Sequence, residues 1–307
     1  MPELPEIEHL RRTLAARIVG ARFEGASLHR ADVLRSSRGR GARHALDAIA
    51  LLDGAVVAAV ERRGKQLAIV TDRAVLGVHL GMSGQLLVAD DRVASPGSHV
   101  HFSAELRTAR GTRLHLRLRD PRRFGGLWLH GSREALMAER WSALGPDALA
   151  IDLGRFRDLL RARRQVKGLL LDQRSVAGIG NIYADEALHR AGIHPGTIAA
   201  RIAPEKAAAL HAAIQQVLQL AVRAGGSTIR DYRSADGACG SFATDHLVYG
   251  RAGQPCATCT RTLRRTVVAG RTTVHCPRCQ RPSRGELSTC GRSGQGQGPM
   301  AVARRRR

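Results

Sequence analysis

The sequence predicts an α+β protein: a leading helix, a two-sheet β-sandwich, a helical domain and a small cysteine module. Three observations support this prediction. A chain of 307 residues is long enough to bury two separate cores. Short apolar runs, several with a period of two, fill residues 55–130, and helical periodicity follows between 133 and 225. Four closely spaced cysteines come after the helices.

Residues 3–17 are expected to form the leading helix. Pro5 falls in the first turn, where a missing backbone N–H costs nothing. Glu3 and Glu6 share that turn, where the helix dipole favours negative charge. Apolar side chains then recur at helical spacing, at Ile7, Leu10 and Leu14. An amphipathic helix with favourable residues in its first turn would account for this segment without any catalytic or binding role.

Seven short apolar runs predict the β-sandwich. Several alternate apolar with polar residues, and glycines and charged turns separate them, as in proteins with two stacked sheets. The runs cover residues 55–60, 65–70, 74–80, 84–88, 99–106, 112–118 and 126–130.

The later part of the chain completes the domain scheme. Helical periodicity recurs over residues 132–144, 153–163, 166–173, 181–192 and 204–225. The final segment is rich in Gly, Ser, Gln and Arg, a composition typical of disorder. We therefore expect a β-sandwich domain over 1–132, a helical domain over 133–245, the cysteine module over 246–281 and a basic tail over 282–307.

The cysteine module has the spacing of a metal site. Two Cys-x2-Cys pairs are separated by sixteen residues, enough for a β-hairpin that returns the second pair to the first. The residues are Cys256, Cys259, Cys276 and Cys279. Four thiolates suit one tetrahedral Zn2+ and leave no position for a catalytic water, so a structural zinc is predicted. A redox-active pair is the main alternative.

The composition predicts a polyanionic partner. The chain has 49 Lys+Arg against 26 Asp+Glu, a formal net charge of +23. Residues 283–307 hold six arginines and one glutamate and so supply only +5 of that charge. Arginine pairs with phosphate oxygens, which makes nucleic acid the expected partner. A genome rich in arginine codons would give a similar excess.

Neither a secretory signal nor a membrane span is expected. The first residues are acidic and lack the basic and apolar regions of a signal peptide. No apolar run approaches the roughly 20 residues that a membrane helix needs. We therefore expect a cytoplasmic protein, in which cysteines serve as ligands more often than as disulfides.

A glycine turn lies between two of the predicted helices. Gly178 and Gly180 would let the backbone approach a phosphate. Asn181 can cap the following helix, whose free N–H groups form an anion site. A tight helix–helix turn without a ligand would use the same residues.

Together these motifs resemble the formamidopyrimidine-DNA glycosylase family, the bacterial 8-oxoguanine DNA glycosylases. The matching segments run in family order up to about residue 281: MPELPEIE (1–8), RRGKQL (62–67), HLGMSGQL (79–86), RDPRRFGG (119–126), LGPDAL (144–149), LLLDQRSVAGIGNIYADEAL (169–188), GGSTIRDY (225–232), VYGRAGQPCATC (248–259) and GRTTVHCPRCQ (270–280). The resemblance implies a helix-two-turns-helix domain, one structural Zn2+ per chain, and a monomer that acts on double-stranded DNA containing a damaged base.

The resemblance assigns the chemistry to an N-terminal proline. After loss of Met1, the secondary amine of Pro2 would attack C1′ of the damaged nucleotide, expel the base and link the sugar to the enzyme. A terminal amine titrates near about 8 and lysine near about 10.4, so the terminal amine is more often neutral at pH 7. The resulting iminium would acidify the C2′ proton, and β- and then δ-elimination would cleave the strand.

The same resemblance assigns the other catalytic groups. Glu3 would be the general acid/base at the sugar, and Glu6 would support it. Lys65 would be a proton donor and a phosphate contact. Arg271 would assist δ-elimination and, with Asn181, grip the phosphates of the flipped nucleotide.

Further DNA contacts follow from matched positions. His99 and Arg163 would contact the DNA. Three residues would fill the space that the flipped base leaves, namely Met82, Arg122 and Phe124. Ordinary core packing is the alternative for Met82 and Phe124.

Two other functions remain open on the sequence alone. The endonuclease VIII group shares the proline chemistry but prefers oxidised pyrimidines, whereas the start PELPE and the three void-filling residues favour oxidised purines. A non-catalytic zinc-finger DNA-binding protein would need neither Pro2 nor Lys65. One loop, residues 236–247, departs from the family by carrying Ala-Cys-Gly-Ser where relatives commonly have Pro-Gly-Tyr.

Overall fold

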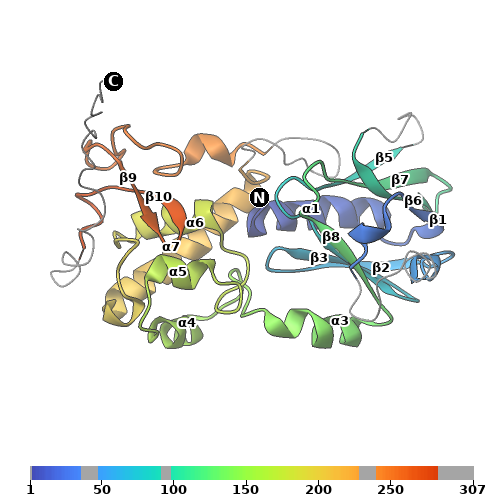
Figure 1. Ribbon diagram of the computed structural model, residues 1–307, viewed down its shortest axis with the longest axis horizontal. Helices are drawn as coiled ribbons and strands as arrows, with labels where there is room; N and C mark the ends of the chain where they lie inside the picture. The colour runs from blue at the N-terminus through green and yellow to red at the C-terminus, as the bar shows by residue number, and fades with distance from the viewer. Residues whose placement is uncertain (1, 36–47, 91–97, 228–239, 283–307) are drawn as a thin grey trace, which may run out of the picture.

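The computed structural model of the chain describes residues 2–35, 48–90, 98–227 and 240–282 (Figure 1). The expectation of a disordered tail beyond residue 282 falls outside these residues, as does part of the departing loop at 236–247. Figure 1 shows the β-sandwich at the right and most of the later helices, with the hairpin, at the left.

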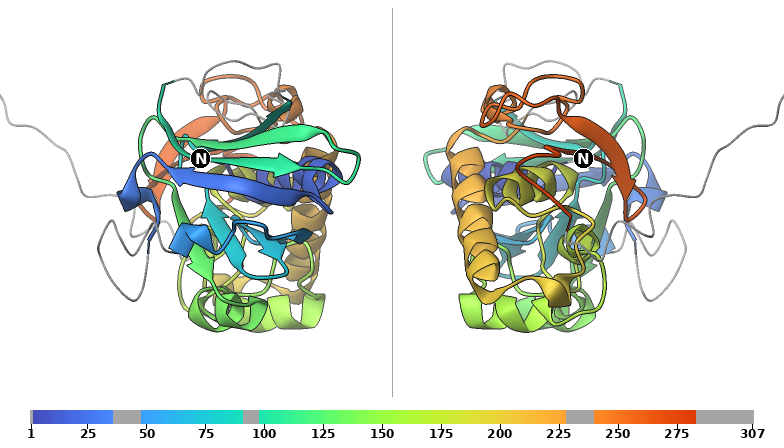
Figure 2. Two further views of the ribbon diagram at one scale, coloured as in Figure 1. Left: turned by 90° about the vertical axis from the view of Figure 1, so that its right-hand side faces the viewer. Right: turned by 90° about the vertical axis from the view of Figure 1, so that its left-hand side faces the viewer.

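Two four-stranded antiparallel sheets form the sandwich that the alternating runs predicted. One sheet has the order β1-β6-β7-β5 and the other the order β2-β3-β4-β8. Figure 2 shows them as two stacked layers. The strands are β1 (Arg22–Leu28), β2 (Val57–Arg63), β3 (Gln66–Thr71), β4 (Val75–His79), β5 (Gln85–Asp90), β6 (Val100–Arg107), β7 (Arg113–Arg119) and β8 (Gly126–His130).

Strand β1 was not expected from the sequence. It pairs with β6 at the edge of its sheet, and Phe23 is the residue that it buries completely. The register shifts between Phe23 and Gly25, which interrupts the alternation that marks the other strands. An edge strand with a bulge therefore lacks the period on which the sequence analysis relied.

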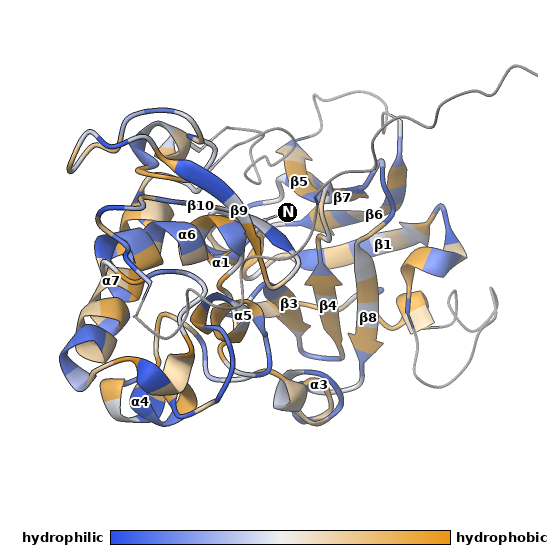
Figure 3. Cartoon of the chain, turned by 60° about the vertical axis from the view of Figure 1, so that its left-hand side comes forward, coloured by the Kyte–Doolittle hydropathy of each residue, from blue (hydrophilic) through white to orange (hydrophobic). Residues whose placement is uncertain are grey.

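Helix α1 (Leu4–Ile18) confirms the predicted leading helix and joins the two parts of the molecule. Its apolar stripe, Ile7, Leu10 and Leu14, packs into the core between the sheets. Figure 3 shows β3, β4 and β8 mostly in the orange of apolar residues. Leu4 packs instead into the core of the helical part, and α1 also contacts α7. The start of the chain is therefore held where the two cores meet.

The helical part has its own core. Tyr183 and Phe156 are among the largest side chains that it buries completely. Its helices are α4 (Leu153–Leu160), α5 (Val166–Leu171), α6 (Asn181–Arg190) and α7 (Pro204–Arg223), whereas α3 (Arg133–Glu139) packs on the sandwich against β4 and β8. Within the described residues, no helix combines the length and the apolarity required to cross a membrane.

A β-hairpin lies between the two cysteine pairs, as their spacing predicted. It consists of β9 (Arg264–Val268) and β10 (Arg271–His275) in antiparallel register. Ala269 and Gly270 connect the strands with φ values of 50° and 69°, the left-handed geometry of a tight two-residue hairpin turn. Strand β10 packs against α6, so the hairpin rests on the helical part.

Candidate active site and metal centre

Pro2 and Glu3 lie at the junction of the two cores. Both residues are buried. The Glu3 carboxylate accepts hydrogen bonds from the N–H groups of Gly180 at 2.7 Å and Ile182 at 3.0 Å. The N–H of Leu4 donates to the carbonyl of Gly178 at 3.1 Å. The first turn of α1 is thus fixed against the start of α6.

This geometry corrects the sequence-based interpretation of the glycine turn. The N-cap of α6 is Gly180, and Asn181 is the first helical residue, so Asn181 does not cap the helix. The anion at this helix terminus is the Glu3 carboxylate, which accepts two of the N–H groups expected for phosphate. Glycine is needed at 180, because a Cβ there would overlap that carboxylate. The glycine turn therefore binds a carboxylate of the protein itself, that of Glu3.

Burial governs the ionisation of Glu3. Desolvation raises the pKa of its carboxyl group, and the nearby Glu6 charge adds to the rise. Lys65 and the two N–H groups act in the opposite direction, and the net pKa lies above the usual range. A carboxyl group with a raised pKa keeps its proton to a higher pH than a free carboxyl group does, which suits a general acid/base.

Glu6 links three separate segments of the chain. Its Oε2 accepts the N–H of Glu3 at 2.8 Å. Its Oε1 accepts the hydroxyl of Tyr183 at 2.5 Å and the N–H of Ser227 at 2.6 Å. Burial is the main cause that raises the pKa of Tyr183 well above its usual value, so this hydroxyl stays protonated and donates. The carboxylate therefore fixes the peptide unit that follows Pro2.

Lys65 lies in the turn between β2 and β3 and is buried. Burial lowers the pKa of its ammonium group, the charges of Glu3 and Glu6 oppose that change, and Arg271 adds to it. The charges of Glu3, Glu6 and Arg271 therefore act on Lys65, and all four residues are ones to which the sequence assigned a catalytic role.

An interdomain contact holds the Lys65 turn. Asp147, from the segment before α4, accepts the N–H of Gly64 at 2.8 Å. The same carboxylate pairs with Arg62 at 2.5 Å, and Arg62 also pairs with Glu8 of α1 at 3.0 Å. Asp147 was in a matched motif, LGPDAL, but nothing in that motif indicated its partner.

Buried polar groups attach β10, and with it Arg271, to the helical part. The amide of Asn181 donates to the carbonyl of Thr272 at 2.9 Å. Lys167 is fully buried, donates to the hydroxyl of Thr273 at 2.7 Å and lies 2.6 Å from a carboxylate oxygen of Asp185. Arg271 itself is exposed. The structure thus brings Asn181 and the strand of Arg271 together.

Lys167 and Asp185 are supporting residues that the sequence alone did not indicate. The only available signal was rarity, because Lys167 is one of three lysines in the chain. Tyr183 and Ser227 were also missed, since each lies in a matched motif with no visible link to Glu6.

Two adjoining loops of the sandwich present Met82 and Phe124. These side chains are 41% and 50% exposed, so core packing does not explain them. The guanidinium of Arg122 lies 4.9 Å from the centre of the Phe124 ring. Asp120 fixes both loops by accepting the hydroxyl of Ser83 at 2.6 Å and the N–H of Gly125 at 2.7 Å. An exposed apolar pair with a cation beside it suits insertion between bases.

His99 and Arg163 lie outside the Glu3 cluster. Both side chains are exposed, His99 just before β6 and Arg163 between α4 and α5. Within the described residues, no hydrogen bond or ion pair joins either of them to Glu3 or Glu6. They stay predictions as DNA contacts.

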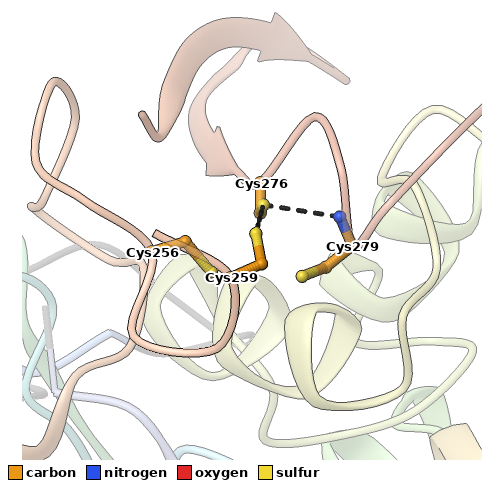
Figure 4. Close-up of side chains that lie close together, drawn as sticks. All are labelled: Cys256, Cys259, Cys276 and Cys279. Carbon is orange, nitrogen blue, oxygen red and sulfur yellow. Dashed lines mark hydrogen bonds between the residues drawn. The ribbon is translucent and has the colours of Figure 1, made fainter. Parts of the chain in front are cut away.

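The four predicted cysteine ligands converge (Figure 4). Their sulfur atoms all lie within 4.8 Å of one another, and Cys259 Sγ lies 3.4 Å from Cys276 Sγ. Zn–S bonds of about 2.3 Å in a tetrahedron require sulfur separations of about 3.8 Å, so the cluster fits one zinc ion. A residue outside the cluster also contacts one of the sulfur atoms, because His189 Nε2 lies 3.5 Å from Cys256 Sγ. Burial raises the pKa of Cys256, but hydrogen bonds from His189 and from backbone N–H groups outweigh it and lower the pKa to about 6, towards the thiolate that zinc binds.

Comparisons with known proteins agree with this arrangement along the chain. Residues 1–127 match the family described as "Formamidopyrimidine-DNA glycosylase N-terminal domain" and residues 144–233 the "Formamidopyrimidine-DNA glycosylase H2TH domain". Residues 253–282 match the "Zinc finger found in FPG and IleRS". The last match and the four-cysteine cluster together suit one structural zinc ion.

Similar proteins cover almost the whole chain. A formamidopyrimidine-DNA glycosylase of Variovorax paradoxus (strain S110) is 43% identical over 286 residues, which is 92% of this chain and 100% of that protein. The Lactococcus lactis Fpg in complex with DNA containing an abasic site superimposes with a TM-score of 0.80 at 31% identity, covering 91% of this chain and 99% of that one. The G226P mutant of that protein with Fapy-dG DNA gives 0.80 at 32%, over 91% and 100%. The chain therefore belongs to the formamidopyrimidine-DNA glycosylase family of DNA-repair enzymes.

Proposed function

We propose that this enzyme excises oxidised purines, 8-oxoguanine and formamidopyrimidines, from double-stranded DNA and then cleaves the strand at the same site. The observation that carries the proposal is that Pro2, Glu3 and Lys65 are all buried and that the charges of Glu3 and Lys65 act on each other at the junction of the two cores. The Lactococcus lactis Fpg mutant bound to Fapy-dG DNA supports the purine class, although the wild-type protein is also known in complex with DNA that contains an oxidised pyrimidine.

The first step forms a covalent bond between Pro2 and the sugar. The neutral amine attacks C1′, the glycosidic bond breaks, and the base leaves with the bonding electrons and takes up a proton. Glu3, whose pKa burial raises, is suited to exchange protons with the sugar. Glu6 holds the peptide unit after Pro2 and so limits the directions in which the amine can point.

The second step cleaves the strand. The adduct loses the amine proton, and its C1′–O4′ bond then breaks with O4′ taking up a proton, which opens the sugar ring and leaves an iminium whose positive charge acidifies the C2′ proton. Removal of that proton expels the 3′ phosphate by β-elimination, and a further elimination expels the 5′ phosphate. Lys65, with a pKa lowered mainly by burial, is suited to transfer protons in this step. Arg271 is suited to stabilise the phosphate that departs.

The remaining residues are proposed to bind and distort the duplex. Asn181 and Arg271 would hold the phosphates of the flipped nucleotide, and His99 and Arg163 would contact the DNA further away. The exposed loops with Met82, Arg122 and Phe124 would fill the vacated stack. One chain supplies every group named here, so we expect the enzyme to act as a monomer.

A direct comparison of lesions tests the proposal. Matched duplexes containing 8-oxoguanine, a formamidopyrimidine or oxidised thymine are incubated with the full chain, and borohydride is added to reduce the iminium. We expect covalent complexes to form faster with the two purine lesions. Preferential trapping on oxidised thymine would contradict the purine assignment, and absence of any trapped complex would contradict the proline chemistry.

A further inference from the structure

A chain of hydrogen bonds connects Glu6 to a histidine that no matched catalytic motif contains. Ser227 donates its backbone N–H to Glu6, and its hydroxyl lies 2.9 Å from Nε2 of His246. That hydroxyl also lies 3.3 Å from the hydroxyl of Tyr183, which in turn donates to the same Glu6 oxygen. His246, Ser227, Tyr183 and Glu6 therefore form one connected network.

His246 is buried in mostly aromatic surroundings. Its side chain packs between the rings of Phe242 and Tyr249, each with a centroid 5.6 Å away. The residue is 8% exposed. The acidic groups whose charge acts on it are Glu186 of α6 and the adjacent Asp245. A buried imidazole needs hydrogen-bond partners, and the hydroxyl of Ser227 meets that need for Nε2.

Ser227 belongs to a segment that is pressed against Glu6. Gly226 has a φ of 87°, and a Cβ at this position would overlap the Glu6 side chain. The carbonyl of Gly226 accepts the N–H of Phe242 at 3.1 Å, which ties this segment to the one that carries His246. A small movement of Ser227 would therefore move a hydrogen-bond donor of Glu6.

We propose that His246 is a positioning residue for the active site: by fixing the hydroxyl of Ser227, it holds Glu6 in the orientation that places the peptide unit between Pro2 and Glu3. This inference rests on the proposed role of Pro2 as the nucleophile. His246 touches neither Pro2 nor Glu3 in this network and acts only through Ser227. Its contribution should therefore appear in the rate of the covalent step and not in the affinity for DNA.

Four variants of the full chain test the proposal: His246→Leu, His246→Gln, Ser227→Ala and the double variant His246→Leu/Ser227→Ala. The single-turnover rate of borohydride trapping and the Kd for an 8-oxoguanine duplex are measured for each. His211→Leu is the control, because His211 is a partly buried histidine of the helical part whose Nε2 lies 2.8 Å from the backbone carbonyl of Ile151.

The expected results separate positioning from general stability. His246→Leu and Ser227→Ala should each slow trapping about fivefold, the rate effect of one net hydrogen bond of about 1 kcal/mol. The double variant should be no slower than either single one, because both changes break the same connection. His246→Gln, whose amide can reach the same hydroxyl, should return to within about twofold of wild type. The Kd should stay within about twofold throughout.

Several outcomes would overturn the inference. An unchanged trapping rate in His246→Leu, losses that multiply in the double variant, or an equal loss in His211→Leu would each contradict a role through Ser227. If His246→Leu does not fold, Ser227→Ala decides, because it keeps the N–H that Glu6 accepts. Failure of the wild-type protein to trap would overturn the proposed function as well, whereas normal wild-type trapping without an effect in the variants would overturn the positioning role alone.

Discussion

The carboxylate of Glu3 accepts a hydrogen bond of 2.7 Å from the backbone N–H of Gly180, a residue 177 positions further along the chain. The contact places the acidic N-cap residue of α1 at the positive end of α6. It joins the two cores at the position of the proposed nucleophile. The active site is therefore complete only when the two cores are packed together, and several predictions depend on this junction.

Substitution of Pro2 should abolish covalent chemistry. Pro2→Gly, or a tag retained before Pro2, should remove borohydride trapping, because a tagged Pro2 has no free amine and glycine lacks the ring that fixes the direction of the amine. Binding to the duplex should change by less than about threefold, since Pro2 contributes no charge-paired phosphate contact. Trapping gels and fluorescence anisotropy measure the two effects. Undiminished trapping by a tagged protein would refute the assignment of the nucleophile.

The close approach of Gly180 to Glu3 predicts a sensitive position. Gly180→Ala should lower the free energy of unfolding by about 1–3 kcal/mol, because a Cβ would overlap the Glu3 carboxylate. Trapping should also slow markedly as Glu3 is displaced. Gly131→Ala is the matched control, since no atom lies within 4 Å of a Cβ built there. Denaturant unfolding and trapping of both variants check the prediction, and equal behaviour would contradict it.

Removal of zinc should affect DNA binding before it affects the sandwich. We expect one zinc ion per chain by elemental analysis, and its loss on chelation or in Cys276→Ser. The hairpin that carries Arg271 depends on the cysteine cluster, so duplex binding should fall at least tenfold while the β-sheet signal in circular dichroism remains. Cys290→Ser, outside the cluster, serves as the control. Active protein that contains no zinc would show this prediction to be wrong.

Glu8 should contribute to stability in a pH-dependent way. Burial raises the pKa of Glu8, but hydrogen bonds from Arg11, Arg12 and Arg62 outweigh it and lower the pKa to about 2. A depressed carboxyl pKa stabilises the fold above the unfolded-state value, and that contribution is lost as pH falls from about 4.5 towards about 2. Glu8→Gln should therefore cost about 2 kcal/mol at pH 7 and less at pH 3.5. Urea unfolding of both proteins at the two pH values measures the difference, and a gap that does not narrow would contradict the prediction.

The salt dependence of DNA binding should distinguish the arginines of residues 283–307 from Arg271. Binding should weaken with salt by a slope of about −0.9 per neutralised phosphate. Deletion of residues 283–307 removes six arginines and one glutamate and should make the slope shallower, with little change in the single-turnover cleavage rate. Arg271→Ala should change the slope little and slow strand cleavage strongly. A tenfold loss of rate on deleting the tail would make the tail part of the catalytic machinery.

The sequence by itself determined the secondary structure and the metal site. Periods of two and 3.6 residues are local properties, so the strands from β2 to β8 and the helices could be predicted from neighbouring residues alone. The spacing of the four cysteines is local in the same sense, since each pair occupies one turn. Strand β1 could not be predicted in this way, because its bulge between Phe23 and Gly25 removes the period. The candidate catalytic residues came from a resemblance in motifs, which says which residues matter but not what they touch.

Only the tertiary structure decided how those residues are held. The partners of Glu3, Lys65 and Arg271 come from distant segments, and the supporting carboxylates, hydroxyls and amides are residue types that occur throughout the chain. Asn181 shows the consequence: its motif suggested a cap, but Glu3 already occupies the end of α6, and the Asn181 amide bonds Thr272 instead. A buried polar group must find a partner, yet its own sequence does not say which one. That choice is made when two cores pack together and bring distant donors and acceptors within about 3 Å of each other.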